Sequence, residues 1–158
     1  MVRDPWPHIV IDNFLDDYDW HLEQVKPWRE MGGSSVKLRK SIKQTERHPV
    51  VAQYLGQLPH RPYERLKADW YYSIQYKGFE YPMHQEWDKK ILSVVVYLGE
   101  SGCGTDLYNV DQTPWGAIEW KPNRAFIFAG QEGVTWHSYK VGDHAVRTTL
   151  NGFLMNDI

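Results

Sequence analysis

Cysteine is nearly absent from this chain of 158 residues, in which Cys103 is the single example. One cysteine cannot form an internal disulfide, so a scaffold held by disulfides is excluded and a reducing compartment is expected. Long apolar runs are also missing. No stretch approaches about 18 consecutive apolar residues, and the N-terminus carries no apolar segment typical of secretory signals. We therefore expect a cytoplasmic protein with no membrane partner.

An excess of charge of one sign is lacking too. The chain has 18 Lys and Arg against 20 Asp and Glu, for a formal net charge of −2. No basic stripe suited to a phosphate backbone occurs, so nucleic acid is not indicated as a partner. A small molecule or a peptide is the expected substrate.

Aromatic residues, by contrast, are abundant at 15%. From residue 69 onward, short segments rich in β-branched and aromatic residues are separated by Gly, Pro, Asp and Asn, which predicts strands with tight connections. No helical segment of about 10–15 residues alternates with these strands, which argues against a doubly wound α/β fold. The predicted strands are 69–76, 91–98, 105–109, 117–120, 124–129, 134–139 and 145–155.

The N-terminal part is predicted to be mainly helical. A short strand is predicted at 8–14, a helix from residue 16 or 17 to about 28, and a second helix from 46 or 49 to 58. The basic segment 30–45 between the helices is typical of a surface loop or a weak strand.

These elements predict an α+β chain that is mainly β and forms a single domain over 1–158. We expect a double-stranded β-helix, the jelly-roll or cupin-like barrel, over about 69–158. The helices of about 1–68 should pack on its outside as support.

A histidine and a carboxylate lie two residues apart at His84 and Glu86. On a strand, such residues point to the same face, and their backbones lie about 6–7 Å apart. At this distance both side chains can bind one metal ion. His137 completes a set of two histidines and one carboxylate, which suits a facial iron site with open positions. Asp88 is the competing carboxylate, but in an extended strand it would lie about 13 Å from His84. Solvated side chains are predicted for four other histidines: His21, His48, His60 and His144.

Arg147 is the second feature that points to chemistry. Alternation places Arg147, Thr149 and Asn151 on one face of the last predicted strand. A buried arginine needs an anionic partner, and its own strand supplies none. Arg147 either pairs with a carboxylate from elsewhere, lies in solvent at a rim, or clamps the carboxylate of a ligand with help from the hydroxyls of Thr149 and Tyr97.

Further landmarks occur in order along the chain: Gln75-Tyr76-x-Gly78-x-x-Tyr81, His84-x-Glu86, Lys90, Ser93, Tyr97-Leu98, Gly104-Thr105, Pro122–Phe128, His137 and Arg147-x-Thr149. Together they resemble the Fe(II)- and 2-oxoglutarate-dependent dioxygenases, in particular the small prolyl 4-hydroxylase-like members of phages and bacteria. The resemblance covers residues 71–156 and extends to the opening segment 7–15.

The resemblance implies a function for each motif. His84, Glu86 and His137 would bind Fe(II), and Arg147 would hold the distal carboxylate of 2-oxoglutarate. Three residues would assist in the co-substrate pocket: Tyr97, Thr149 and, as a weaker candidate, Tyr76.

The implied reaction uses O2 and converts 2-oxoglutarate to succinate and CO2 while a substrate is hydroxylated, with ascorbate as an accessory reductant. Peptidyl proline is the substrate that the resemblance suggests. The chain departs from most relatives at Glu86, where they carry Asp. Because an acid is nevertheless present, the halogenating variants, which lack it, are disfavoured.

Two functions are therefore predicted from different classes. The first is an Fe(II)/2-oxoglutarate oxygenase, most simply a hydroxylase. The alternative is a cupin-like module that binds a metal or a small acid without turnover. Arg147 discriminates between them, because a metal site without turnover does not need a carboxylate clamp beside it.

Overall fold

The computed structural model describes residues 2–38, 66–86, 90–143 and 146–156. Its described part opens with strand β1 (Ile9–Ile11), helix α1 (Tyr18–Arg29) and strand β2 (Ser35–Leu38). The first predicted strand and helix are thus confirmed, and the weak strand in the basic segment is β2. The second predicted helix lies outside the described residues. The remaining strands are β3 (Leu66–Gln75), β4 (Glu80–His84), β5 (Lys90–Leu98), β6 (Thr105–Tyr108), β7 (Pro114–Ile118), β8 (Ala125–Phe128), β9 (His137–Lys140) and β10 (Arg147–Asn156).

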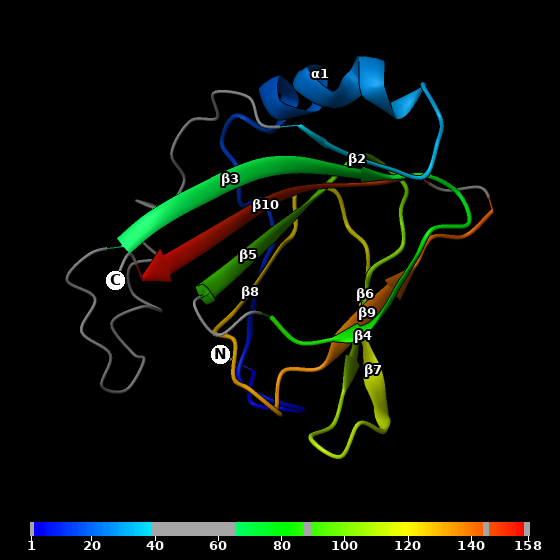
Figure 1. Ribbon diagram of the computed structural model, residues 1–158. Coiled ribbons are helices and arrows are strands. Elements are labelled where there is room, and N and C mark those ends of the chain that lie inside the picture. The colour runs from blue at the N-terminus through cyan, green and yellow to red at the C-terminus, as the bar shows by residue number, and fades with distance from the viewer. Residues whose placement is uncertain (1, 39–65, 87–89, 144–145, 157–158) are drawn as a thin grey trace.

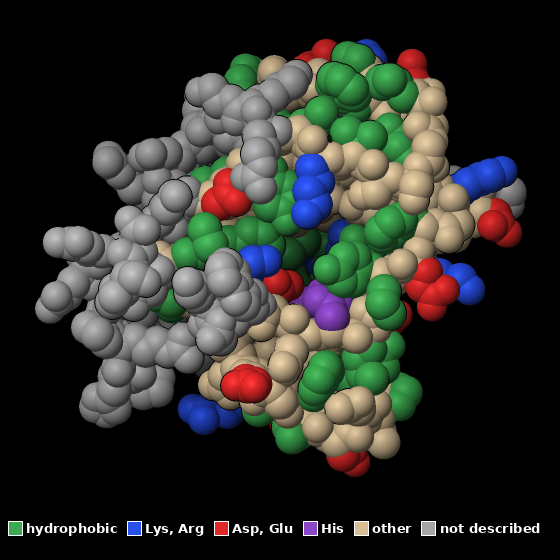
Figure 2. Space-filling model, in the orientation of Figure 1, with side chains coloured by type: hydrophobic (Ala, Val, Ile, Leu, Met, Phe, Trp, Pro, Cys, Tyr) green, Lys and Arg blue, Asp and Glu red, His purple; other side chains and the backbone are tan. Residues whose placement is uncertain are grey.

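The described strands form two antiparallel sheets. The major sheet has the order β1-β8-β5-β10-β3-β2, and the minor sheet has the order β4-β9-β6-β7. Helix α1 lies over β3 and β2 on the outer side of the major sheet, and the minor sheet lies on the opposite side (Figure 1). This arrangement confirms the predicted double-stranded β-helix. On the face drawn in Figure 2 the surface is hollowed, and a histidine side chain lies in the hollow.

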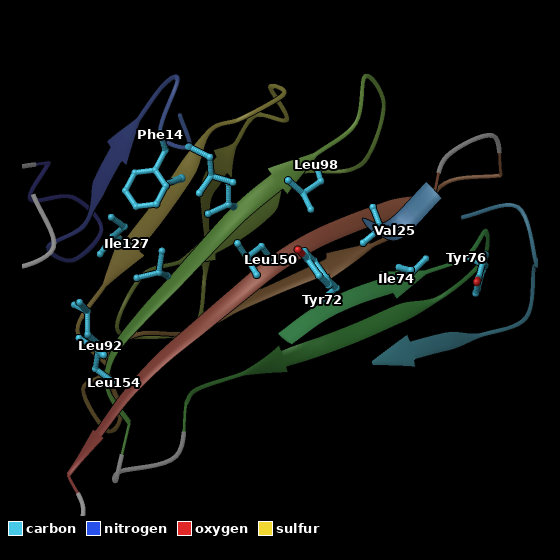
Figure 3. Close-up of a cluster of buried hydrophobic side chains, with 14 residues drawn as sticks. Phe14, Val25, Tyr72, Ile74, Tyr76, Leu92, Leu98, Ile127, Leu150 and Leu154 are labelled. Carbon is cyan, nitrogen blue, oxygen red and sulfur yellow. The ribbon is translucent and has the colours of Figure 1, made fainter. Parts of the chain in front are cut away.

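The outer face of the major sheet holds the larger part of the core. Alternation along β5 places Leu92, Val94, Val96 and Leu98 on this face, where they pack with Val25 from α1 (Figure 3). A smaller cluster fills the inner side: Trp6, Tyr97, Leu107, Ile118, Phe126 and Phe128. The central strands are therefore buried on both faces, which explains why their sequences contain long apolar runs.

The prediction for His21 was wrong. This histidine lies on the inward side of α1 with no exposed surface. Its Nδ1 is 2.7 Å from the hydroxyl of Tyr72, and its Nε2 is 3.1 Å from a carboxylate oxygen of Asp17. A buried histidine is tolerated here because polar partners meet both ring nitrogens.

Helix α1 contains Pro27 and continues through it to Arg29. The proline lies in the last turn, so the helix ends two residues later rather than at the proline itself. Within the described part of the chain, no helix is long and apolar enough to cross a membrane.

Replacing Gly104 by Ala is expected to destabilise the fold. A Cβ at this position would lie 1.8 Å from the carbonyl oxygen of Ile118, a backbone atom in the paired strand β7. Relief requires the β6–β7 pairing to separate, so we expect a loss of about 3 kcal/mol in the free energy of unfolding. For a domain of this size, that loss lowers the melting temperature by roughly 6–12 °C.

Gly116 in the same hairpin offers a matched control, since a Cβ there meets nothing within 4 Å. Thermal unfolding of G104A and G116A followed by circular dichroism separates the two cases. Equal melting temperatures would contradict the packing argument.

Candidate metal and co-substrate site

The three candidate metal ligands converge at the junction of the two sheets. His84 ends β4 and His137 begins β9, and the two residues are direct neighbours in the register of this pair. Glu86 follows two residues after the end of β4. One ligand atom from each of the three residues lies within 4.8 Å of the others, so the group could hold a single metal ion.

Both histidines are oriented by the same local contact. The Nδ1 of His84 lies 2.8 Å from the carbonyl oxygen of Pro82, and the Nδ1 of His137 lies 2.9 Å from that of Thr135. A carbonyl oxygen can only accept, so in each ring Nδ1 carries the proton and Nε2 carries the free electron pair in the neutral form. Both Nε2 atoms are therefore set up as metal ligands.

Glu86 meets both histidines with one oxygen. Its Oε1 lies 3.2 Å from Nε2 of His137 and 3.7 Å from Nε2 of His84. Burial by itself raises the pKa of Glu86, but the hydrogen bonds that His137 and His84 donate from Nε2 when they are protonated, together with the charges of His137 and Lys90, outweigh it and hold the pKa well below the ordinary value. The carboxylate is thus ionised, as a metal ligand requires.

Contrary to the prediction from the sequence, His84 and Glu86 do not lie on the same face of one strand. β4 ends at His84, and Glu86 lies on irregular backbone between the two sheets. The turn away from the strand is what brings the carboxylate back toward both imidazoles. Asp88, the competing acid, lies outside the described residues.

The three candidate metal ligands line a cavity of about 160 Å³ between the sheets. In Figure 2 it is the hollow where acidic and basic side chains surround the histidine. Two walls are aromatic: Phe79, Tyr81 and Tyr139 come from the minor-sheet side, and Tyr71 and Phe153 come from the major sheet. The cavity also contains Lys37, Gln75, Lys90, Thr105, Asn151 and Arg147.

Arg147 is buried in this cavity with 4% of its surface exposed. It donates from an Nη atom to Oγ1 of Thr105 over 3.1 Å, and its guanidinium lies 3.7 Å from the ring centroid of Tyr139. Burial raises the pKa of Tyr139 to about 12, so the ring stays neutral and offers its face to the cation.

No acidic residue among those described pairs with Arg147, and its Nε has no hydrogen-bond partner there. Of the three possibilities that the sequence left open, a rim position in solvent is therefore excluded. A salt bridge to another described residue is excluded as well. A buried guanidinium that faces a cavity with free donors suits the carboxylate of a ligand.

Tyr97 and Thr149 lie on the same side of the major sheet as Arg147, but neither lines the cavity. Both are fully buried, and they are register neighbours on β5 and β10. The hydroxyl of Tyr97 is 2.7 Å from Oγ1 of Thr105. Tyr97 thus reaches the cavity through Thr105, which also accepts the hydrogen bond from Arg147.

Tyr76 does not belong to this site. Its hydroxyl donates to the carbonyl oxygen of Trp28 at the end of α1, and the ring packs in the outer core. The reason is strand parity, because Tyr71, Ser73 and Gln75 face the cavity and Tyr76 therefore faces away. Tyr76, expected to assist in the co-substrate pocket, therefore does not line this cavity.

Several cavity residues received no separate role from the sequence. Tyr139 could have been found from alternation alone, since it lies two residues after His137 on the same strand. Thr105 and Lys90 are landmarks of the resemblance, but their contacts could not be predicted, because they reach the site from other strands through the packing of the sheets.

A jelly roll in which two histidines and one carboxylate meet inside the barrel defines a candidate mononuclear metal centre of the facial-triad kind. Solved structures with the same fold include viral collagen prolyl hydroxylase from Paramecium Bursaria Chlorella virus-1 in complex with 2-oxoglutarate. That likeness has a TM-score of 0.68 at 14% identity and covers 100% of both chains.

Two further structures are similar over most of their length. A prolyl 4-hydroxylase from Pseudomonas putida has a TM-score of 0.62 at 14% identity, with 96% of this chain and 93% of that one covered. A prolyl hydroxylase from Trichoplax adhaerens, solved with a hypoxia-inducible-factor peptide fragment, has a TM-score of 0.64 at 15% identity, with 95% and 84% covered. No family model matches the chain, and no curated protein matches it in sequence.

Proposed function

We propose that the protein is an Fe(II)- and 2-oxoglutarate-dependent oxygenase, and specifically a hydroxylase. The observation that carries the proposal is Arg147, a buried arginine without an acidic partner among the described residues, in the same cavity as His84, Glu86 and His137. The donor set of two imidazoles and one carboxylate fits Fe(II). A dicarboxylate co-substrate would fit between that set and the guanidinium.

Each group in the cavity then has one task. His84 and His137 would hold Fe(II) through their Nε2 atoms and Glu86 through Oε1, and Arg147 would bind the distal carboxylate of 2-oxoglutarate. Thr105 orients the guanidinium by accepting one of its hydrogen bonds, with Tyr97 behind it. Thr149 is proposed only as a buried neighbour that supports this wall.

When bound, Fe(II) with 2-oxoglutarate and O2 would supply oxidative decarboxylation to succinate and CO2, coupled to hydroxylation of a substrate. The protein contributes placement and the exclusion of bulk water. Phe126 and Phe128 line the cavity from β8 and are both fully buried. Such an apolar wall strengthens the interactions of the charged groups beside it.

The proposed substrate is a peptidyl proline, and ascorbate is proposed as the accessory reductant. Support for a peptide comes from the fold shared with the Trichoplax enzyme, whose structure contains a peptide fragment. The aromatic walls of the cavity suit a compact apolar ring. We also propose that residues 1–158 form one domain, since β1 and β2 belong to the major sheet. The single cysteine supports a cytoplasmic location.

Succinate formation tests the proposal directly. Purified protein supplied with Fe(II), 2-oxoglutarate, ascorbate and air is expected to release succinate, the product of the proposed decarboxylation of the co-substrate. Treatment with a chelator should remove the activity, and Fe(II) added in excess should restore it. Succinate release that is unchanged by the chelator, or no release with iron present, would contradict the proposal.

A further inference from the structure

Lys90, on the major sheet, contacts one of the candidate metal ligands, Glu86. It is the first residue of β5 in the major sheet, and its Nζ donates to Oε2 of Glu86 over 2.9 Å. On its other side the same ammonium lies 3.6 Å from the ring centroid of Phe153 on β10. Lys90 is thus held between a carboxylate and an aromatic face.

The two oxygens of Glu86 consequently have separate partners. Oε1 faces the Nε2 atoms of His84 and His137, and Oε2 faces Lys90. A carboxylate with one oxygen committed to a lysine offers the other to a metal as a single ligand. The pair is well shielded, with 14% of the Glu86 side chain and 22% of the Lys90 side chain exposed.

Glu86 needs such a restraint more than its two companions do. Each histidine is fixed by its own backbone carbonyl contact and lies in the paired strands β4 and β9. Glu86 lies beyond the end of β4, so no strand pairing fixes its backbone. Glutamate also has one more rotatable bond than aspartate, which increases the rotamer freedom lost on binding a metal.

We propose that Lys90 is a positioning residue that fixes Glu86 as a one-oxygen metal ligand and ties the metal centre to the major sheet. This inference rests on the proposed metal site but not on turnover. An ion pair that merely stabilises the fold would have the same geometry. The two roles differ in what happens to metal affinity in a folded variant.

Metal affinity of the full chain provides the test. Mn(II), a divalent ion that does not oxidise in air, is titrated calorimetrically into the metal-free protein. Lys90→Met removes the charge and keeps the length of the side chain, and we expect Mn(II) affinity to fall about 10-fold or more, as for other groups that orient a ligand. Lys90→Arg retains a donor for Oε2 and should restore most of the affinity. Lys140→Met, at an exposed position on β9, is the control that should match the wild type.

A double-mutant cycle separates positioning from fold stability. Glu86→Asp shortens the arm, so one carboxylate can no longer reach both Lys90 and the histidines. If Lys90 acts through Glu86, then Lys90→Met should cost much less Mn(II) affinity in the Glu86→Asp background than in the wild type. Additive losses would overturn the inference, as would an unchanged affinity in Lys90→Met.

Thermal unfolding of each metal-free variant shows whether it is folded before titration. If the wild type itself binds no Mn(II), the proposed function falls and the inference with it. If the wild type binds Mn(II) and Lys90→Met binds it equally well, only the inference falls.

Discussion

His137→Ala is expected to abolish succinate formation and to lower Mn(II) affinity by at least about 100-fold. Groups that only orient a metal ligand contribute about 10- to 100-fold, so loss of a ligand itself should reach at least the upper end of that range. The loss should be large here because His137 lies in register beside His84 and contacts Glu86 at 3.2 Å. Without it, two ligands remain on one side of the cavity. Titration calorimetry and a succinate assay measure the two effects.

His21→Gln is the matched control, since this histidine is also buried but lies on the outer side of the major sheet. Replacing it disturbs the contacts with Tyr72 and Asp17, so thermal stability should fall. Mn(II) affinity should remain that of the wild type. A His137→Ala protein that is folded and still binds Mn(II) with wild-type affinity would remove His137 from the metal site.

The two long central strands were predicted closely, because each contains an extended run of β-branched and apolar residues. β5, predicted at 91–98, is found at 90–98, and β10, predicted at 145–155, is found at 147–156. In β10 the outer face carries Leu150 and the inner face carries Arg147, so the alternation is unambiguous. The prediction for 134–139 was less accurate, because the strand begins only at His137. A turn ends at Val134, and the apolar residues Val134 and Trp136 made this segment resemble a strand in the sequence.

Two parts of the candidate site have a signal within one segment of the sequence. The spacing of His84 and Glu86 is local, and so is that of Arg147 and Thr149. Tyr76 lies outside the cavity that Gln75 lines, because a shift of one residue along a strand moves a side chain to the opposite face.

Contacts between distant segments could not be read from the chain. His21 looks like a surface residue of a helix, and its partner Tyr72 lies 51 residues away. The same holds for Lys90, because only the packing of β5 against the end of β4 shows which acid it meets.

Arg147→Met is expected to weaken 2-oxoglutarate binding to the metal-loaded protein by about 2 to 5 kcal/mol, or roughly 30- to 4,000-fold in Kd. Removing the guanidinium leaves a ligand carboxylate without a planar cation that can donate two parallel hydrogen bonds, since the other cations among the described lining residues are lysines. Arg147→Lys keeps the charge but not the paired donors, so its affinity should fall between the two. Arg3→Met, at an exposed position, is the control. Titration of 2-oxoglutarate into the Mn(II)-loaded variants gives the Kd values.

The stability of ligand-free Arg147→Met distinguishes a structural role of Arg147 from a role in ligand binding. Breaking a buried salt bridge costs about 3 to 5 kcal/mol because it leaves a charge without a partner. Arg147 has no such partner among the described residues, so Arg147→Met loses neutral contacts: the hydrogen bonds to Thr105 and Cys103 and the ring contacts with Tyr139 and Tyr97. We therefore expect its free energy of unfolding to change by less than about 1.5 kcal/mol while co-substrate binding is lost. Strong destabilisation with unchanged 2-oxoglutarate affinity would instead favour a module that binds metal without turnover. A residue that contributes little to the ligand-free fold, yet is buried at 4% exposure, is best explained by the ligand that it binds.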